Sequence, residues 1–172
     1  KDCEWLADLM RHGLIRRSFV PDRATHELRE LSRYRTQVTR ERASEVNRVQ
    51  KVLEGANIKL GSVVSDVMGV SGRAILTAMS KGETDPGKLA DRAVDRIQKA
   101  KLGELEQALD GTVRDHHRFM LRMLLQRIDD IDKVLENLDQ EVQRRLHPFE
   151  ETIRRLDGIP GIATRTAEVI LA

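Results

Sequence analysis

The chain has 172 residues, enough for one domain or for one domain with an extension. Hydrophobic residues make up 40 %, charged residues 34 % and aromatic residues only 3 %, which argues against a β-rich or wide globular core and predicts an all-α fold of long helices. Thirty basic against 28 acidic side chains leave a formal charge of +2, too little to indicate nucleic-acid binding unless the charges are segregated.

The first predicted segment, 1–21, contains a short helix at residues 2–12 and a link that ends at Pro21. Its apolar residues recur at helical spacing, and Gly13 follows as a stop signal. They are Trp5, Leu6, Leu9 and Met10. Asp2 opens this helix, where an N-cap is the simplest role for its carboxylate.

The second segment, 22–56, is predicted to be a long helix from Arg23 to Glu54, closed by Gly55. Arg35 and Arg42 interrupt its apolar stripe midway. From residue 23 to residue 51 there are eight Arg or Lys against four Glu, so this helix is a candidate platform for a nucleic-acid backbone, with Arg35, Arg42 and Arg48 as contacts. The alternative is a solvated face whose charges pair along the helix.

The third segment, 57–111, is punctuated by glycines and predicts three or four short helices. Ser71 is a candidate cap for a helix through Met79. Asp85 followed by Pro86 has the form of a helix start with proline at the first position. This segment forms a small helical insert.

The fourth segment, 112–155, contains the clearest element, a long helix predicted from Thr112 to Leu146, with packing that extends past Pro148 after a kink. Its apolar residues alternate at steps of three and four, as in a coiled coil. This apolar seam consists of Leu121, Leu124, Ile128, Ile131, Leu135, Leu138 and Val142. The two long helices are similar in length, so we expect an antiparallel coiled-coil hairpin with the insert at its tip. The same seam could instead pair with a second copy of the chain.

The last segment, 156–172, reads as a helix, a Gly-Ile-Pro-Gly hairpin and a second helix. Gly158 and Gly161 permit unusual backbone conformations, and the amides at Thr164 begin the next helix. These three residues are candidate phosphate contacts, although a plain helix corner gives the same pattern. Because the chain stops at Ala172 inside this helix, we expect a fragment of a longer protein.

The lone cysteine, Cys3, suits a reducing cytoplasm, and no run of about 18 apolar residues exists to span a membrane. The first residues also lack the pattern of a signal peptide. The sequence therefore predicts a cytoplasmic location without membrane contact.

Three stretches resemble the DEDD-type insertion-sequence transposases, the bridge-RNA-guided recombinases. They are KDCEWLADLMRHGLI at 1–15 with SFVP at 18–21, ANIKLGSVVSDVMGVSGRAIL at 56–76, and GIPGIATRTAEVILA at 158–172. They are similar, in this order, to the end of the RuvC-like domain, the middle region, and the opening of the C-terminal transposase domain.

The resemblance implies a DNA transposase that cuts and rejoins DNA under the direction of a guide RNA, with Mg²⁺ held by four acidic residues. Asp2 matches the last aspartate of that set, and Cys3 stands where alanine is frequent. One carboxylate should not retain Mg²⁺, which needs several oxygen ligands, so this chain alone is expected to be inactive. Its expected partners are DNA, guide RNA and a second copy of itself.

Two other functions remain open from the residues alone. One is a non-enzymatic scaffold whose long helices only oligomerise. The other is a helix-hairpin-helix module that binds DNA through the hairpin at 158–164. Binding to nucleic acid separates the first from a transposase, and the location of the binding residues separates the second.

Overall fold

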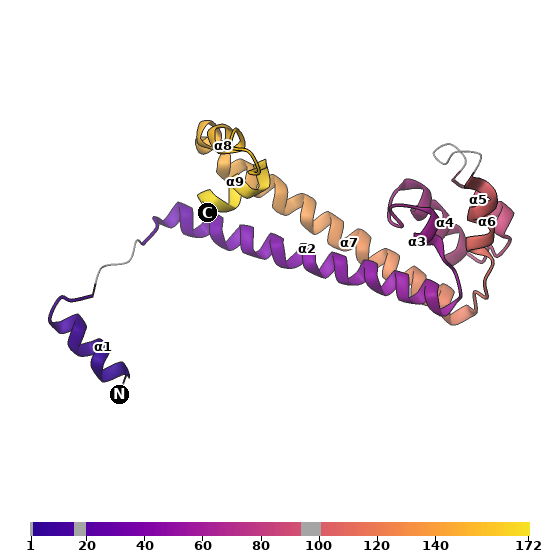
Figure 1. Cartoon of the computed structure of the whole chain (residues 1–172), viewed down its shortest axis with the longest axis horizontal. Helices are drawn as coiled ribbons and strands as arrows, with labels where there is room; N and C mark the ends of the chain where they lie inside the picture. Colours follow the sequence, from indigo (N-terminus) through magenta and orange to yellow (C-terminus); the bar gives the residue numbers. More distant parts are fainter. Residues whose placement is uncertain (1, 16–19, 94–100) are drawn as a thin grey trace. The chain divides into compact units, whose positions relative to one another are not determined.

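A computed structural model describes residues 2–15, 20–93 and 101–172. Within these ranges the backbone forms helices and no strand, so the all-α prediction is confirmed (Figure 1). The elements are α1 (Asp2–Arg11), α2 (Arg23–Gly55), α3 (Leu60–Val63), α4 (Val70–Ser80), α5 (Pro86–Asp91), α6 (Leu102–Leu109), α7 (Asp115–Leu146), the 3₁₀ turn η2 (His147–Phe149), α8 (Glu150–Asp157) and α9 (Thr164–Leu171). The chain divides into two compact units, one of Arg33–Arg145 and one of Lys1–Ser32 with Leu146–Ala172.

Helix α2 has a well-defined start and end. The Asp22 carboxylate accepts a hydrogen bond of 2.7 Å from the Thr25 amide, which lowers the pKa of Asp22. At the other end Asn57 takes a left-handed φ of 60°, and the Ile58 amide donates back to the Leu53 carbonyl at 2.8 Å. Gly55 is the last helical residue, so Asn57, rather than the predicted glycine, supplies the left-handed turn that ends the helix.

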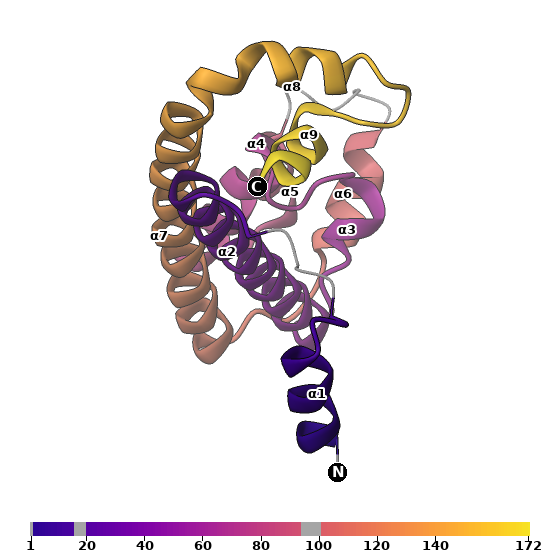
Figure 2. The ribbon, with the colours of Figure 1, turned by 90° about the vertical axis from the view of Figure 1, so that its left-hand side faces the viewer.

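In the Arg33–Arg145 unit, α2 and α7 run side by side and in opposite directions (Figure 2). Arg35 pairs with Asp139 and Arg42 with Asp132, so residue numbers rise along α2 as they fall along α7. The apolar core lies closer to the insert than these pairs, toward the end of α2 and the start of α7. Val49 and Leu53 of α2 cluster there with Leu121, Leu124, Leu125 and Ile128 of α7.

The helical insert packs on that core, with Leu60, Ile75, Leu76, Met79, Leu89, Leu105 and Leu109 fully or almost fully buried. Its two ends are tied together, because the Thr112 amide donates to the Ala56 carbonyl at 2.8 Å. This bond also explains why α7 begins at Asp115 rather than at the predicted Thr112, since Thr112 is held in the connection.

The predicted helix starts in the insert were right in one case and wrong in the other. Asp85 caps α5 by accepting from the Lys88 amide at 3.0 Å, with proline at the first turn. Helix α4 is preceded by Gly69, so the prediction of Ser71 as its cap was wrong. Gly72 lies in the first turn of α4, where an added Cβ would come within 2.2 Å of the Val67 carbonyl oxygen. Close backbone packing therefore fixes where α4 starts.

The second unit, Lys1–Ser32 with Leu146–Ala172, begins its C-terminal part where α7 ends at Leu146. From there the chain passes through η2 into α8, as expected for a kink near Pro148. Helices α8 and α9 pack on each other, and Ala167 is fully buried. Helix α1 carries no buried residue, and Gly13, just after its end, has a φ of +67°, as a glycine stop signal predicts. None of the helices in the described ranges is both long and apolar enough to cross a lipid bilayer.

Candidate nucleic-acid interface

Two of the three arginines that the sequence suggested as nucleic-acid contacts face α7 instead of solvent. Arg35 is only 5 % exposed and donates from Nη1 to Oδ1 of Asp139 at 3.4 Å. Arg42 holds Asp132 with two bonds, from Nε to Oδ1 and from Nη2 to Oδ2, the second at 3.2 Å. The hydrogen bonding of Arg42 to the Asp132 carboxylate raises the pKa of Arg42. In this conformation the two side chains hold α2 against α7, and Arg35 presents almost no surface to phosphate.

The third arginine, Arg48, belongs to a cluster around a buried carboxylate. Glu45 is 3 % exposed, and its Oε1 accepts from Arg48 Nη1 and forms an ion pair with Arg127 Nε, each at 2.8 Å. Its Oε2 is buried and has no hydrogen-bond partner among the described residues. Arg48 is itself exposed, so it combines a structural bond with access to solvent.

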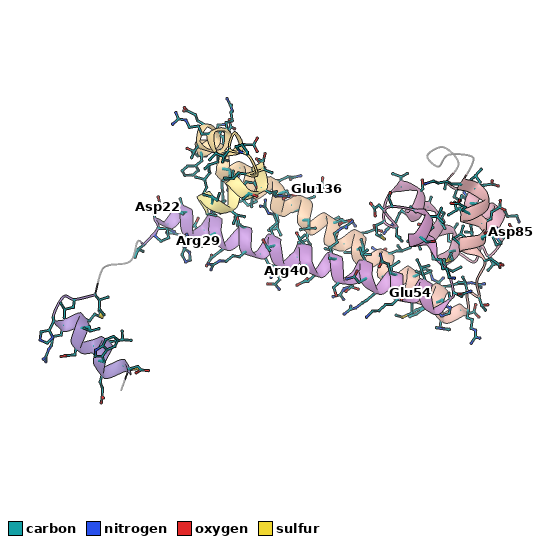
Figure 3. The ribbon with its side chains drawn as sticks, in the orientation of Figure 1. Asp22, Arg29, Arg40, Glu54, Asp85 and Glu136 are labelled. Atoms are coloured by element: carbon teal, nitrogen blue, oxygen red, sulfur yellow. The ribbon has the colours of Figure 1, made fainter. Side chains whose placement is uncertain are left out.

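A different basic surface lies on the opposite side of α2. It is made by Arg33, Arg40 and Lys51, which we call the α2 basic face; Arg40 is marked midway along the helix in Figure 3. At 3.6 residues per turn these positions stand half a turn from buried Val49 and from Arg42. All three are exposed, and none has an ion-pair partner within the described ranges. Gln37, Ser44 and Asn47 complete the face, so no acidic side chain lies along its centre.

The sequence contained the signal for this face, although counting charges over the whole helix missed it. Arg35 and Arg42 continue the three-and-four spacing of the apolar stripe, which assigns them to the packed side. Arg33 and Arg40 lie outside that spacing and have no ion-pair partner in the described ranges, whereas Arg48, also outside it, is bonded to Glu45. Helical phase therefore identifies the arginines that pack against α7 better than the local number of charges does.

The hairpin at 158–164 has part of the geometry expected for phosphate binding. Gly161 has a φ of +89°, as predicted, but Gly158 has φ −70° and continues the helical conformation, so the prediction of an unusual backbone conformation was wrong for Gly158. Thr164 begins α9, and its hydroxyl donates to the Asp157 carboxylate at 3.1 Å. A shallow hollow of about 350 Å³ lies against the turn and is also lined by Asp157. That carboxylate opposes an anion, so phosphate contact at this hairpin stays a prediction.

Asp2, the predicted metal ligand, lies exposed in the first turn of α1. Magnesium binding requires several oxygen ligands that converge on one point. Across residues 2–15, 20–93 and 101–172, no group of three or more His, Cys, Asp or Glu side chains is placed to hold a metal ion. These residues alone therefore do not fit a Mg²⁺ site, and the role of Asp2 in the intact enzyme stays a prediction.

The apolar seam of α7 is largely covered within the single chain. Leu121, Leu124, Ile128, Leu138 and Val142 are buried, and Ile131 and Leu135 are half-buried. A second copy would have to displace α2 to reach these residues. Self-association stays a prediction, but in this conformation it would need another surface.

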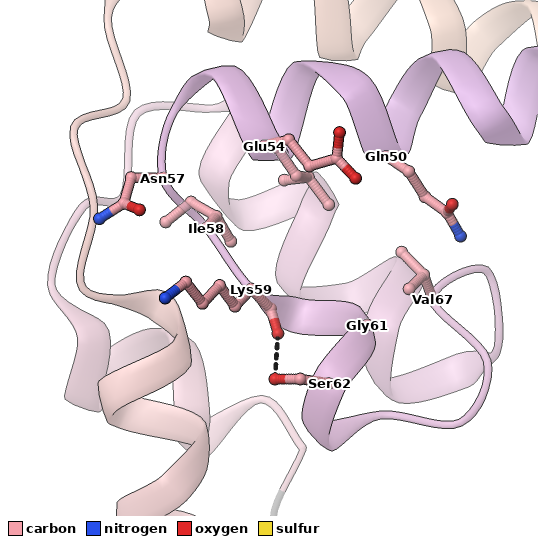
Figure 4. A pocket seen from close by; sticks show the side chains of 9 residues that line it. Gln50, Glu54, Asn57, Ile58, Lys59, Gly61, Ser62 and Val67 are labelled. Atoms are coloured by element: carbon pink, nitrogen blue, oxygen red, sulfur yellow. Dashed lines mark hydrogen bonds between the residues drawn. The ribbon is translucent and has the colours of Figure 1, made fainter.

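A pocket of about 440 Å³ opens where α2 meets the insert (Figure 4). Leu53, Ile58 and Val67 form its buried floor. The polar groups around it, including Glu54 and Lys59, are exposed and of opposite charge. No buried polar side chain points to a specific ligand here, and the mixed charge does not favour a polyanion.

Residues 1–58 match the family model of IS110-type DEDD transposases, described as "Transposase". The matched range includes α1 and all of α2, and with α2 the basic face defined above. No curated protein and no solved structure matches the chain. The match supports a transposase-related chain and suggests DNA as a partner.

Proposed function

We propose that this chain is the helical nucleic-acid-binding part of a DEDD-type transposase, and that the α2 basic face contacts the phosphate backbone. The observation that carries the proposal is the segregation of charge on α2. The arginines on the packed side are neutralised by aspartates of α7, whereas those on the opposite side are exposed and unpaired in the described ranges. A purely structural helix has no need for an exposed row of basic residues with no acidic residue along its centre.

The geometry of the face suits an extended polyanion. Arg33 and Lys51 are 18 residues apart, which corresponds to roughly 27 Å along a helix. Each strand of a duplex presents one charge per ~3.4 Å of axis, so three side chains over this length can each reach a separate phosphate. Contacts of this kind position a duplex without reading its sequence.

Salt dependence of binding tests this proposal. The variant Arg33→Gln, Arg40→Gln, Lys51→Gln is compared with a control that removes the same charge from exposed positions elsewhere, Lys101→Gln, Arg122→Gln, Lys133→Gln. Each lost phosphate contact reduces the slope of log K against log salt by about 0.9. The slope of the first variant should therefore be about 2.7 smaller than that of the wild-type chain. The control should keep most of the wild-type slope. If the two variants had equal slopes, the proposal that the α2 basic face contacts phosphates would be wrong.

The finer implications of the resemblance are also part of the proposal. The intact enzyme uses Mg²⁺, cuts and rejoins DNA, and takes its target from a guide RNA, while this chain contributes binding. Comparing a DNA duplex, an RNA duplex and a structured RNA in the same assay distinguishes the partner. If the chain bound none of the three at low salt, a scaffold function would replace this one.

Self-association is a second proposed property, and exposed apolar residues at the start of α7 favour it. Phe119 and Met123 are 54 % and 51 % exposed and lie one turn apart, next to half-exposed Met120. A second copy of the chain packing on this face would cover them. The variant Phe119→Ser, Met123→Ser should lower the mass measured by sedimentation equilibrium, while Val134→Ser on the same helix should not. A monomeric wild-type chain would end this part of the proposal.

The helix-hairpin-helix alternative makes a contrasting prediction. If the hairpin carried the binding, Gly161→Val would strain its left-handed backbone and weaken binding of nucleic acid. Our proposal expects this variant to bind as the wild-type chain does.

A further inference from the structure

A second positively charged surface lies in the insert, on the exposed side of α4. A groove of about 570 Å³ runs along this helix and ends against the residue that follows α5. The residues that line it are Val70, Arg73, Ala74, Thr77, Ala78, Lys81 and Arg92. All but the last recur at alternating steps of three and one, which is one face of a helix.

Three cations and no acidic side chain line this groove. Arg73 is anchored, because its Nη2 pairs with Asp129 of α7 and donates to the Leu125 carbonyl at 3.2 Å. Lys81 and Arg92 are exposed, and their side chains have no ion-pair partner within the described residues. The groove therefore keeps two uncompensated positive charges, one at the end of α4 and one from the end of α5.

The shape and chemistry of the lining indicate which polyanion fits. Ala74 and Ala78 are small, so an elongated ligand can approach the helix closely, and the Thr77 hydroxyl offers a hydrogen bond. No aromatic side chain lines the groove, so unpaired bases would find nothing to stack on. A duplex, which presents phosphates and keeps its bases inside, needs only what the groove provides.

We infer that the α4 groove is a second backbone-binding site for a nucleic-acid duplex, with Lys81 and Arg92 as its phosphate contacts. For the class of partner this inference rests on the function proposed above, but it uses different residues. Arg73 is a positioning residue that ties α4 to α7 and leaves the two exposed cations to meet the phosphates. A chain with both sites contacts a duplex at two separate places in the Arg33–Arg145 unit.

The test measures binding of a fluorescent DNA duplex by the full chain between 50 and 200 mM salt. The groove variant is Lys81→Gln with Arg92→Gln, and its control, Arg122→Gln with Lys133→Gln, removes the same charge from α7. Losing two phosphate contacts should reduce the slope of log K against log salt by about 1.8. Raising the salt from 50 to 200 mM should then weaken binding of the groove variant roughly tenfold less than it weakens binding of the wild-type chain. A second variant, Thr77→Asp, places a negative charge in the groove and should weaken binding, while Thr77→Asn should not. Helical circular dichroism checks that each variant is folded.

The outcomes separate this inference from the function on which it rests. If the groove variant keeps the wild-type slope while the α2 variant loses its share, the groove is not a binding site and the proposed function stands. If the groove variant alone lowers the slope, the groove is supported and the α2 basic face is wrong. If the wild-type chain binds neither a DNA duplex nor an RNA duplex at 50 mM salt, the groove inference is wrong, and the proposed function falls with it if a structured RNA does not bind either. If a single strand of equal length binds the wild-type chain more tightly than the duplex, and the groove variant removes that preference, the duplex assignment is wrong.

Discussion

The cluster around Glu45 allows a stability prediction whose sign depends on which partner is removed. The Glu45 side chain is only 4 % exposed, whereas those of Arg48 and Arg127 are 57 % and 64 % exposed. Replacing both arginines with methionine keeps their aliphatic stems but leaves a buried carboxylate without a counter-charge. Replacing Glu45 with methionine instead leaves two arginines that water already solvates. We therefore expect the first change to be costly and the second nearly neutral.

Breaking one side of a buried ion pair costs about 3–5 kcal/mol, because the remaining charge stays buried without a partner. Arg48 and Arg127 are each more than half exposed, so water screens part of their attraction to Glu45. The Arg48→Met, Arg127→Met variant should therefore lose stability toward the lower end of that range.

Urea denaturation followed by circular dichroism measures these differences. The four chains needed are the wild type, Glu45→Met, the double arginine variant and the triple variant, which together form a mutant cycle. The triple variant should recover most of the stability that the double variant loses, because it contains no stranded charge. If Glu45→Met cost as much as the double variant, or if the triple variant did not recover the lost stability, the explanation by desolvation would be wrong.

Three further predictions concern other parts of the chain. Hydrogen bonds from Arg144 and Arg145 lower the pKa of Glu141 from 4.5 to about 2, so its contribution to stability is full above pH 4.5 and is lost as the pH falls toward 2; Glu141→Gln should flatten the stability profile in that window. Gly111→Ala should destabilise the insert, because its Cβ would lie 2.4 Å from the Ala56 carbonyl oxygen, whereas Gly103→Ala in α6 meets no atom within 4 Å and should stabilise the chain in thermal unfolding by about 0.5–1 kcal/mol. Asp85→Ala removes the side-chain cap of α5 and should cost about 1 kcal/mol in denaturant unfolding.

Most helices could be predicted from the sequence because their signals are local. The three-and-four spacing of apolar residues in α7, the Asp-Pro start of α5 and the glycine after α1 each depend on a few neighbouring residues. The errors arose where a contact with the backbone of another segment determines the first residue of a helix. Gly72 packs against Val67, and Thr112 is held by Ala56, so the starts of α4 and α7 shifted from their predicted positions.

Of the α2 arginines that the sequence predicts as nucleic-acid contacts, Arg35 and Arg42 pair with aspartates of α7, so our proposal turns to other arginines of the same helix. An excess of arginine on α2 is visible in the sequence, yet the role of each arginine depends on its helical phase and on the charges that α7 brings opposite it. Asp132 and Asp139 are seven residues apart, as are Arg35 and Arg42, and this equal spacing lets both pairs form in one antiparallel register. A sequence reading that had matched the two spacings would have assigned these arginines to packing and turned to Arg33 and Arg40 for binding.

The same charges determine which helices can share the packed side. Two copies of α7 that met through the apolar seam would bring the aspartates at 132 and 139 into one interface with those of the other copy, and two copies of α2 would do the same with Arg35 and Arg42. Juxtaposed like charges at an interface cost several kcal/mol, whereas α2 against α7 pairs opposite signs at both positions. The seam therefore selects an α2–α7 pair over either self-pair. Two copies that each keep this pair within one chain would associate through another surface, such as the exposed Phe119 and Met123 of α7.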